Sequence, residues 1–491
     1  MRTDVRPVVA HALPTDPGGL RERGGVGAVC AGFVVVAGVL VPLGLPLGWD
    51  EIVYASRFGP YGPGVPFSAP RTRGVPLLLA PVASWTDSVV LLRLWMTALA
   101  GGALYLGFRP WVGVMRALRR PAGAAVAAAL YGSLWFALFY ANSAMPNHYT
   151  AMGALAATGC FLRRDPGRAA YAGLAAGLAV VTLIRPNDGA AVALPFSAAA
   201  LLVPAWRGRG RLVAVAAGVA AGAVPWVVEA WLRFGGVARR LGEASDTQGG
   251  MRPVLSLKAH LTALDGPLLC RPCTDDTMAL GAAAWWLLLP LLVALGLWTT
   301  RRAGLATAPL RLAVAVGASA ALPYLFLVPY AAPRFLLPGY ALLVLPAAVG
   351  LLAVADRARG RARASRQVRV ALAVVLLGHA AVQIAQVRTH VSVQERARAD
   401  WQRISAVLRE GGVRPPCLIK GNSLAIPVAY TAGCASAAMA DPAPATAVIL
   451  RRADPPHWAR EWPRRPVPDT YNPGWSVAVR PETGVRRDAR P

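Results

Sequence analysis

The sequence predicts an all-α membrane protein with about eleven transmembrane helices and a small α/β appendage after them. Of its 491 residues, 55% are hydrophobic and only 15% are charged. A water-soluble protein of this composition would lack the polar surface to cover its core. Apolar runs that could cross roughly 30 Å of hydrocarbon, which takes about 20 helical residues, recur along the chain. We expect membrane helices at 26–48, 88–108, 121–141, 148–162, 169–185, 189–205, 212–232, 279–299, 312–331, 335–355 and 370–388.

The positions of the arginines predict the orientation of these helices. A net charge of +27 would suit a nucleic-acid partner, but no basic face carries interleaved aromatics for base stacking, so none is expected. Instead the arginines gather at every second connection, at 109–120, 163–168, 207–211, 301–311 and 357–369. The positive-inside rule places these connections and the N-terminus in the cytoplasm. We therefore expect a multi-pass protein of a bacterial plasma membrane, with its C-terminus outside.

Three regions follow from this topology. A cytoplasmic tail, 1–25, precedes a membrane domain, 26–388, whose long outward loops are 49–87 and 233–278. Within the first loop, the apolar run 74–82 is too short to cross and predicts an interfacial or re-entrant helix. The extracytoplasmic region 389–491 begins with a helical pattern at 393–410, continues with strand-like runs at 417–420 and 425–430, and becomes irregular from about Asp454.

Cysteine positions agree with an outward-facing appendage. Cys30 and Cys160 fall within spans and are interpreted as small apolar residues. Four others lie on the outward side, where disulfides can form: Cys270, Cys273, Cys417 and Cys434. Their pairing does not follow from the sequence. The CxxC at 270–273 could instead be half of a zinc site or a redox pair, although no second CxxC or His pair accompanies it.

An acidic pair, Asp50-Glu51, directly follows the first span in an aromatic loop. Outside a bacterial membrane there are no nucleotide sugars, so a transferase there would take its activated sugar from a lipid carrier such as a polyprenyl phosphate. A carboxylate at Asp50 could then remove the proton of the acceptor hydroxyl while that oxygen attacks the sugar carbon opposite the phosphate, which predicts inversion. Glu51 would support Asp50 or bind a divalent cation, Mg or Mn.

The leaving phosphate needs cationic partners, and guanidinium groups can grip two of its oxygens at once. Several arginines break the positive-inside pattern by lying on the outward side, and His148 lies in a short outward turn near them. The candidate phosphate-binding residues are Arg71, Arg73, Arg185, Arg334 and His148.

Each of these residues also has a structural alternative. An acidic pair after a span can simply solvate the helix end. Arg185 and Arg334 can anchor helix ends by reaching the interface, and His148 can be an ordinary polar turn residue.

Three motifs in order resemble one known superfamily. They are Asp-Glu-x-x-Tyr at 50–54, the Arg-Pro turn at 185–186, and Ala-Pro-Arg-Phe-Leu-Leu-Pro-Gly-Tyr at 332–340. Together they resemble the GT-C superfamily of integral membrane glycosyltransferases, in particular the branch with protein O-mannosyltransferases and the bacterial lipid A aminoarabinose transferase. Over 26–355 the resemblance implies juxtamembrane helices in the first outward loop, a polyprenyl-phosphate-linked sugar donor, and Asp50 as the base. The chain departs from that pattern in lacking a clear second acidic motif in 233–278 and a recognised acceptor-binding domain.

Two other classes remain as alternatives. A transporter or lipid flippase would keep ionisable residues near the bilayer midplane, whereas here polar residues gather in outward loops. A polysaccharide polymerase or ligase would be expected to carry a larger outward loop. The sequence therefore favours an inverting glycosyltransferase that moves a sugar to an envelope protein, lipid or polysaccharide at the outer face of the membrane.

Overall fold

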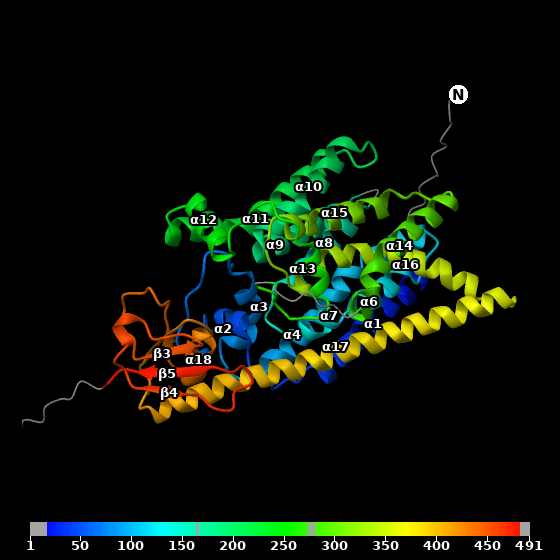
Figure 1. The fold of residues 1–491 in the computed structure, drawn as a ribbon. Coiled ribbons are helices and arrows are strands. Elements are labelled where there is room, and N and C mark those ends of the chain that lie inside the picture. The colour runs from blue at the N-terminus through cyan, green and yellow to red at the C-terminus, as the bar shows by residue number, and fades with distance from the viewer. Residues whose placement is uncertain (1–16, 164–165, 272, 274–279, 482–491) are drawn as a thin grey trace, which may run out of the picture.

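The computed structural model describes residues 17–481 except 164–165, 272 and 274–279. Long helices make up most of the molecule, and a small sheet lies at one end (Figure 1). The helices of the membrane domain are α1 (Pro17–Leu40), α4 (Val89–Phe108), α5 (Trp111–Ala117), α6 (Gly123–Gly132), α7 (Trp135–Phe139), α8 (Asn147–Phe161), α9 (Arg168–Ile184), α10 (Pro186–Leu202), α11 (Arg209–Phe234), α14 (Leu280–Arg302), α15 (Ala308–Phe326), α16 (Leu337–Ala358) and α17 (Arg363–Glu410).

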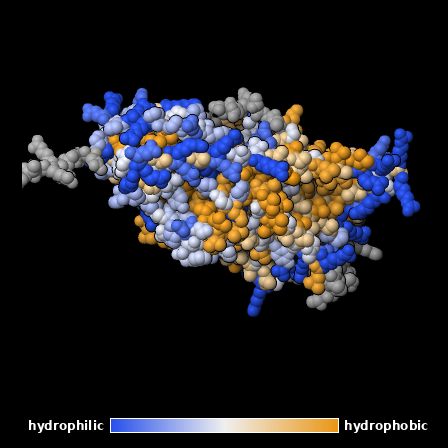
Figure 2. All heavy atoms as spheres, turned by 90° about the horizontal axis from the view of Figure 1, so that it is seen from below, coloured by the Kyte–Doolittle hydropathy of each residue, from blue (hydrophilic) through white to orange (hydrophobic). Residues whose placement is uncertain are grey.

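The predicted polytopic membrane fold is confirmed. Every predicted span overlaps a helix, although the third is broken between α6 and α7. In the part of the chain that the structure describes, 7 helices are long and apolar enough to cross a membrane, so the count of eleven remains a prediction. Figure 2 shows apolar residues along the middle of the molecule and hydrophilic residues at its two ends, as a membrane-spanning body requires.

Two predicted boundaries differ from the structure. The first helix begins at Pro17, inside the predicted tail, and ends at Leu40 rather than near residue 48. At the other end, α17 continues from its membrane part to Glu410 without a break at 388. The end of α17 at Glu410 agrees with the end of the predicted helical pattern 393–410, and beyond it Gly412 has a φ of 92°, a left-handed conformation that favours glycine.

Close helix packing centres on α16, whose apolar stretch is mostly buried, whereas less than half of the residues in each of the other candidate spans are buried. Where α14 crosses α16, a Cβ on Gly296 would overlap the carbonyl oxygen of Pro346. Gly350 packs against α14 in the same way, near the carbonyl of Leu292. Such small residues let two helix backbones approach each other closely inside a membrane.

The outward loops contain short helices that lie against this bundle. The first loop forms α2 (Trp49–Ala55), the 3-10 helix η1 (Gly59–Tyr61) and α3 (Gly74–Ala83), and the second forms α12 (Val237–Thr247) and α13 (Leu257–Thr262). The short helix expected at 74–82 is thus present as α3. At its start, Gly74 lies against the backbone of Ile184 so closely that a Cβ there would be 2.8 Å from the Ile184 Cα. This contact holds the first loop against the end of α9.

The appendage is a five-stranded sheet with one helix, joined to the bundle by α17. Its strands, β1 (Leu418–Gly421), β2 (Ala435–Ser436), β3 (Ala447–Arg451), β4 (Arg464–Pro466) and β5 (Trp475–Val479), lie in the order β2-β1-β3-β5-β4. Strand β1 pairs in parallel with β2 and β3, while β5 is antiparallel to β3 and β4.

Two expectations for the appendage were wrong. The run 425–430, expected as a strand, belongs to helix α18 (Ala425–Ala432). The segment expected to be irregular from Asp454 contains β4, β5 and the 3-10 helix η3 (His457–Ala459), although residues 482–491 lie outside the described part. Disulfides join Cys270 to Cys273 and Cys417 to Cys434, and Cys30 and Cys160 are free thiols.

Candidate functional site

Asp50 lies in the first turn of α2, where Gly48 serves as the N-cap in an extended conformation. Its carboxylate is 35% exposed and accepts a hydrogen bond from Arg71 Nη2 at 2.7 Å. Arg334 Nη2 lies 3.8 Å from its other oxygen. The acid is therefore held by two guanidinium groups and still reaches solvent.

Arg334 comes from the 3-10 helix η2 (Pro333–Leu336), which leads into α16. Its Nη1 donates to the Tyr140 hydroxyl and to the Leu268 carbonyl, both at 2.9 Å. These two hydrogen bonds fix the guanidinium, and its side chain is only 9% exposed. It is therefore a rigid positive charge beside Asp50.

Arg185 joins the same site from the turn between α9 and α10. The following Pro186 begins α10, so Arg185 must be extended, and its φ and ψ are −148° and 93°. Thr72, next to Arg71, donates from Oγ1 to the Ile184 carbonyl at 2.8 Å, which brings the Arg71 segment to this turn. Arg185 Nε lies 3.4 Å from Asp188 Oδ2, and its guanidinium stacks 5.2 Å from the centre of the Tyr324 ring.

The guanidinium groups of Arg185 and Arg334 lie 5.6 and 5.3 Å from the centre of the same Phe335 ring, so the two arginines are close together. Tyr54 lies one helical turn after Asp50. Burial raises the pKa of its hydroxyl to about 12; the negative charge of Asp50 adds to this, whereas Arg71, Arg185 and Arg334 oppose it. All four charged groups therefore act on one buried hydroxyl. Three guanidinium groups against Asp50 and Asp188 leave the site positive, as an anionic ligand requires.

Glu51 has a different environment from its neighbour. Its buried carboxylate forms an ion pair with Arg93 of α4 at 3.2 Å, and Arg398 of α17 lies 3.7 Å away. It also accepts hydrogen bonds from the backbone N–H groups of Gly48 and Ala144, at 2.6 and 3.0 Å. Burial raises the pKa of Glu51, but the two arginines and the two N–H groups outweigh burial and lower it. Glu51 thus connects α2 to the bundle and to the appendage helix.

The other two predicted phosphate ligands, Arg73 and His148, contact residues other than Asp50. Arg73 pairs with Glu229 of α11, with Nη2 2.5 Å from Oε1. His148 is buried in α8, where Nε2 lies 3.0 Å from the Ala100 carbonyl and Nδ1 lies 3.1 Å from the Tyr131 hydroxyl. Because a carbonyl can only accept, Nε2 carries the proton and Nδ1 accepts from Tyr131. Both ring nitrogens are thus occupied by protein groups.

The acidic residues at this site do not fit a divalent cation. Glu51 is already neutralised by two arginines, and Asp50 is held by Arg71 and Arg334. Among the residues that the structure describes, no three His, Cys, Asp or Glu side chains are grouped so that they could hold a metal ion. A requirement for a divalent cation therefore remains a prediction.

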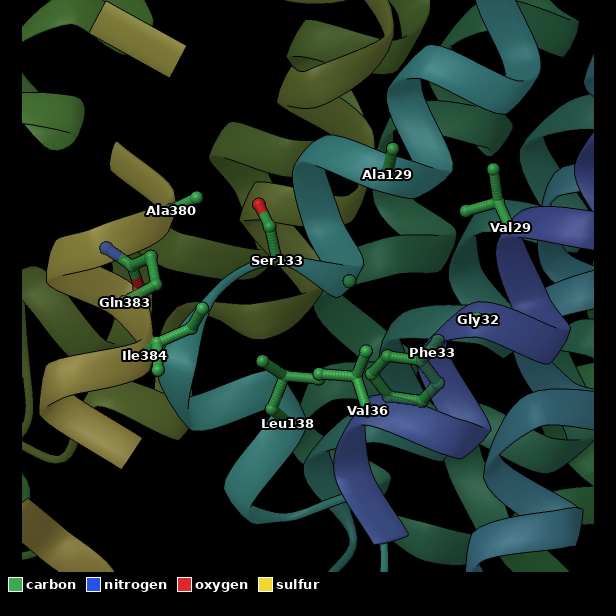
Figure 3. Close-up of a pocket in the computed structure, with 11 residues that line it drawn as sticks. Val29, Gly32, Phe33, Val36, Ala129, Ser133, Leu138, Ala380, Gln383 and Ile384 are labelled. Atoms are coloured by element: carbon green, nitrogen blue, oxygen red, sulfur yellow. The ribbon is translucent and has the colours of Figure 1, made fainter. Parts of the chain in front are cut away.

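A cavity of about 220 Å³ lies elsewhere, within the membrane domain (Figure 3). It is lined by α1, α6, α7 and α17, and most of its lining is apolar; Ser133 and Gln383 are its polar side chains. Gln383 Oε1 accepts from the Trp135 backbone N–H at 2.7 Å. The lining includes neither Asp50 nor the arginines around it.

Sequence reasoning missed the residues that support the site from within helices. Arg93 and Tyr140 fall within the predicted spans 88–108 and 121–141, and Arg398 falls within the predicted appendage, but none of the three was a predicted site residue. Arg93 carried one signal: it is a charge inside a predicted span, which generally requires a partner. No signal in the sequence linked Arg398 to Glu51, which is more than three hundred positions earlier.

The helical bundle and the short helices of its first outward loop form a fold that is similar to two solved structures of ArnT. The structure of ArnT from Cupriavidus metallidurans bound to undecaprenyl phosphate matches with a TM-score of 0.59 at 15% identity, over 93% of this chain and 98% of that one. ArnT in the apo state matches over the same shares, with a TM-score of 0.57 at 16% identity.

An oligosaccharyltransferase from Archaeoglobus fulgidus in complex with Zn and sulfate matches less closely, with a TM-score of 0.48 at 13% identity over 83% of this chain and 62% of that one. No protein-family model matches the sequence, and no curated protein matches it either. The two ArnT structures confirm the predicted resemblance to the GT-C superfamily at the level of the fold.

Proposed function

We propose that the protein is an inverting glycosyltransferase that moves a hexose or pentose from a polyprenyl-phosphate donor to an envelope acceptor. The observation that carries the proposal is a partly exposed carboxylate, Asp50, held between Arg71 and Arg334 with Arg185 close by. The fold shared with an ArnT structure that contains undecaprenyl phosphate supports a lipid-phosphate donor.

The three arginines suit the leaving group. As the bond from the anomeric carbon to the phosphate oxygen breaks, its electron pair passes to the phosphate, whose negative charge increases. Guanidinium groups stay charged at any working pH and bind two phosphate oxygens in a planar arrangement. Arg334 and Arg185 are fixed by protein contacts before the substrate arrives, so they need little reorganisation to stabilise this charge.

Asp50 suits the acceptor side of the reaction. A donor phosphate would compete with Asp50 for Arg71, which frees a carboxylate oxygen to take the proton of the acceptor hydroxyl. The acceptor oxygen then bonds to the anomeric carbon from the face opposite the phosphate, and the configuration inverts. Tyr54 and the buried Glu51 hold α2 in place, so Asp50 is presented from a short rigid helix rather than a free loop.

The orientation that places this chemistry outside follows from the arginine clusters. They put the N-terminus in the cytoplasm, and Asp50, Arg185, Arg334 and the appendage on the outer face. The bilayer is then both the solvent of the bundle and the source of the lipid-linked donor.

Transfer of radiolabelled sugar from a panel of polyprenyl-phosphate donors into membrane acceptors tests the proposal. We expect Asp50→Asn to reduce transfer by about 10²- to 10⁴-fold, the usual contribution of a general base. Asp356→Asn is the matched control, because Asp356 pairs with Arg120 and Arg359, whose connections are predicted to be cytoplasmic. Equal transfer by wild type and Asp50→Asn would remove Asp50 as the base. No transfer from any donor would favour the transporter alternative.

A further inference from the structure

A second group of arginines surrounds Glu229 at the outer end of α11. Arg73 Nη2 and Arg240 Nη2 lie 2.5 and 3.0 Å from its two oxygens, and Arg233 Nε lies 3.8 Å from Oε1. Arg57 joins the group across the Phe67 ring, because the guanidinium groups of Arg57 and Arg73 lie 5.5 and 4.5 Å from the ring centre. One carboxylate thus faces four positive charges.

Arg240 is the structural member of this group. Its side chain is fully buried, and it donates to the carbonyls of Ala69, Trp226 and Arg71 at 3.1, 2.7 and 2.8 Å. Its guanidinium also lies 4.6 Å from the centres of the Trp226 and Phe234 rings. It therefore fixes the segment that carries Arg71 and Arg73 against α11, and its donors are used.

Among the described residues, Arg57 and Arg233 keep unused binding capacity, whereas Arg73 donates from Nε and Nη2 to Glu229 Oε1 at 3.0 and 2.5 Å. Arg57 donates only to neutral oxygens, those of Val65 and Ser56, and forms no ion pair among the described residues. Burial lowers its pKa, and the positive charges of Arg73, Arg233 and Arg71 lower it further. Arg233 is 59% exposed and shares one oxygen of Glu229 with Arg73. An anion in this position would relieve the repulsion among these like charges.

This group adjoins the proposed reaction centre without being part of it. The side chain of Arg71 holds Asp50, while its backbone carbonyl accepts from Arg240 of the second group. A polyprenyl monophosphate brings one phosphate, for which Arg71, Arg185 and Arg334 are already present. A second set of three arginines therefore suits a second anion, and the acceptor is the substrate that could supply it.

We infer that Arg57, Arg73 and Arg233 form an acceptor-binding site for an oxyanion, a phosphate or carboxylate, so that the acceptor is an anionic molecule with its reacting hydroxyl at Asp50. The inference rests on the proposed function, since it names the class of acceptor. It also reassigns Arg73 from donor to acceptor binding.

Binding to the full chain in phosphatidylcholine nanodiscs tests this site without an activity assay. The probe is radiolabelled glycerol 3-phosphate, measured by equilibrium dialysis with undecaprenyl phosphate at saturation, and glycerate and glycerol serve as competitors. We expect the wild-type protein to bind glycerol 3-phosphate even when undecaprenyl phosphate is saturating. Glycerate should compete with this binding, and glycerol should not. Arg233→Gln and Arg57→Gln should each weaken probe binding about tenfold or more, the usual loss for a charge-assisted hydrogen bond.

Arg239→Gln is the matched control, because Arg239 is 72% exposed and, within the part of the chain that the structure describes, its ion pair is with Glu243 on its own helix α12. Equal probe binding by Arg233→Gln and Arg239→Gln, or no binding by wild type, would overturn the inference. Loss of all probe binding with undecaprenyl phosphate would also overturn it, since only one anion site would exist. Displacement of the probe by phosphatidylglycerol in the nanodisc would assign the arginines to bilayer headgroups instead.

The proposed function can fail separately. If undecaprenyl phosphate does not bind and Arg71→Gln changes nothing, the donor site is wrong, whereas Arg233-dependent binding of glycerol 3-phosphate would still establish an anion site. If the donor binds and only the Arg233 effect is missing, the acceptor class is wrong and the transferase proposal stands.

Discussion

Replacing Glu51 by glutamine tests whether this acid stabilises the fold or takes part in the reaction. Glutamine keeps the shape of the side chain and one oxygen to accept a backbone N–H, but it leaves Arg93 and Arg398 buried without a counter-charge. Breaking a buried ion pair by removing one partner costs about 3–5 kcal/mol. Because native proteins are stable by only about 5–15 kcal/mol, Glu51→Gln should lower stability substantially. Asp50→Asn, at a site 35% exposed to solvent, should change it by under about 1 kcal/mol.

Thermal unfolding of the purified chain tests this difference in stability between the two variants. It is followed by tryptophan fluorescence at one scan rate and in one detergent. We expect the midpoint to fall clearly for Glu51→Gln and hardly at all for Asp50→Asn, while transfer falls for both. Adding Arg398→Gln to Glu51→Gln removes one of the unpaired buried charges. The double variant should therefore be more stable than the sum of the two single effects predicts. A Glu51→Gln protein as stable as wild type but without transfer would refute this reasoning and place Glu51 in the chemistry.

The ion pairs of Glu51 with Arg93 and Arg398 also make the stability of the protein depend on pH. The pKa of Glu51 is lowered in the folded protein, so its stabilising effect is fully present above the unfolded value, about 4.3, and is lost as the pH falls through the folded value. From pH 7 to pH 5 this residue should not change the unfolding midpoint. Below about pH 4, the midpoint of wild type should fall more steeply than that of Glu51→Gln; parallel curves would show that Glu51 is not held as a buried anion.

Three further outcomes are expected. Arg71→Gln should weaken binding of undecaprenyl phosphate about 10- to 150-fold, for the loss of one charged donor, which a direct titration would show; unchanged affinity would exclude Arg71 from the donor site. Gly296→Ala should destabilise the bundle by about 1–3 kcal/mol through overpacking against α16, whereas Gly102→Ala, with nothing within 4 Å of the added Cβ, should not; similar midpoints would contradict the close crossing. Cys417→Ser should lower the stability of the appendage by about 3 kcal/mol, the value for a loop of roughly this length, which limited proteolysis of the C-terminal region would report as faster cleavage.

The membrane domain was predictable because its helices leave a simple signal. Each crossing needs a long apolar run, so the spans followed from a one-dimensional pattern. The arginines predict which side of the membrane each loop faces, and that orientation remains a prediction. The third span was harder. It is broken between Gly132 and Trp135, yet nothing in its apolar composition differs from an unbroken helix. An apolar composition indicates that a segment lies in the membrane, but it does not show whether the helical hydrogen bonds along its backbone are continuous.

The appendage shows where such patterns fail. The run 425–430 is short and apolar, and a stretch of that length is compatible with a strand or with a buried helix turn. Its state is decided by packing, since α18 contributes Val428 and Ala429 to the same core as Ile52 of α2. Strand β5 likewise depends on pairing with β3, more than twenty residues earlier in the chain.

At the site, the sequence indicated the charges and not their partners. Arg71 and Arg334 lie beside Asp50, as their outward positions suggested. Arg73 is only two residues from Arg71, and yet it pairs with Glu229, because Arg240 holds the intervening backbone against α11. His148 is a buried helix residue although the sequence placed it in a turn. Ion pairs between distant segments depend on the arrangement of helices, which no local pattern encodes.

The unbroken helix α17 fixes the distance between the arginines at its start and the appendage at its end. It carries the arginines of its first turn at one end and Arg398, which reaches Glu51, near the other. A helix rises about 1.5 Å and turns about 100° with each residue, so its length and phase together set where Arg398 meets α2. Deleting one residue between 370 and 398 would shift that contact to a different face of the helix. Adding seven would restore the face but move the appendage roughly 10 Å along the helix axis, so the number of residues in this single helix sets the distance between the appendage and the membrane domain.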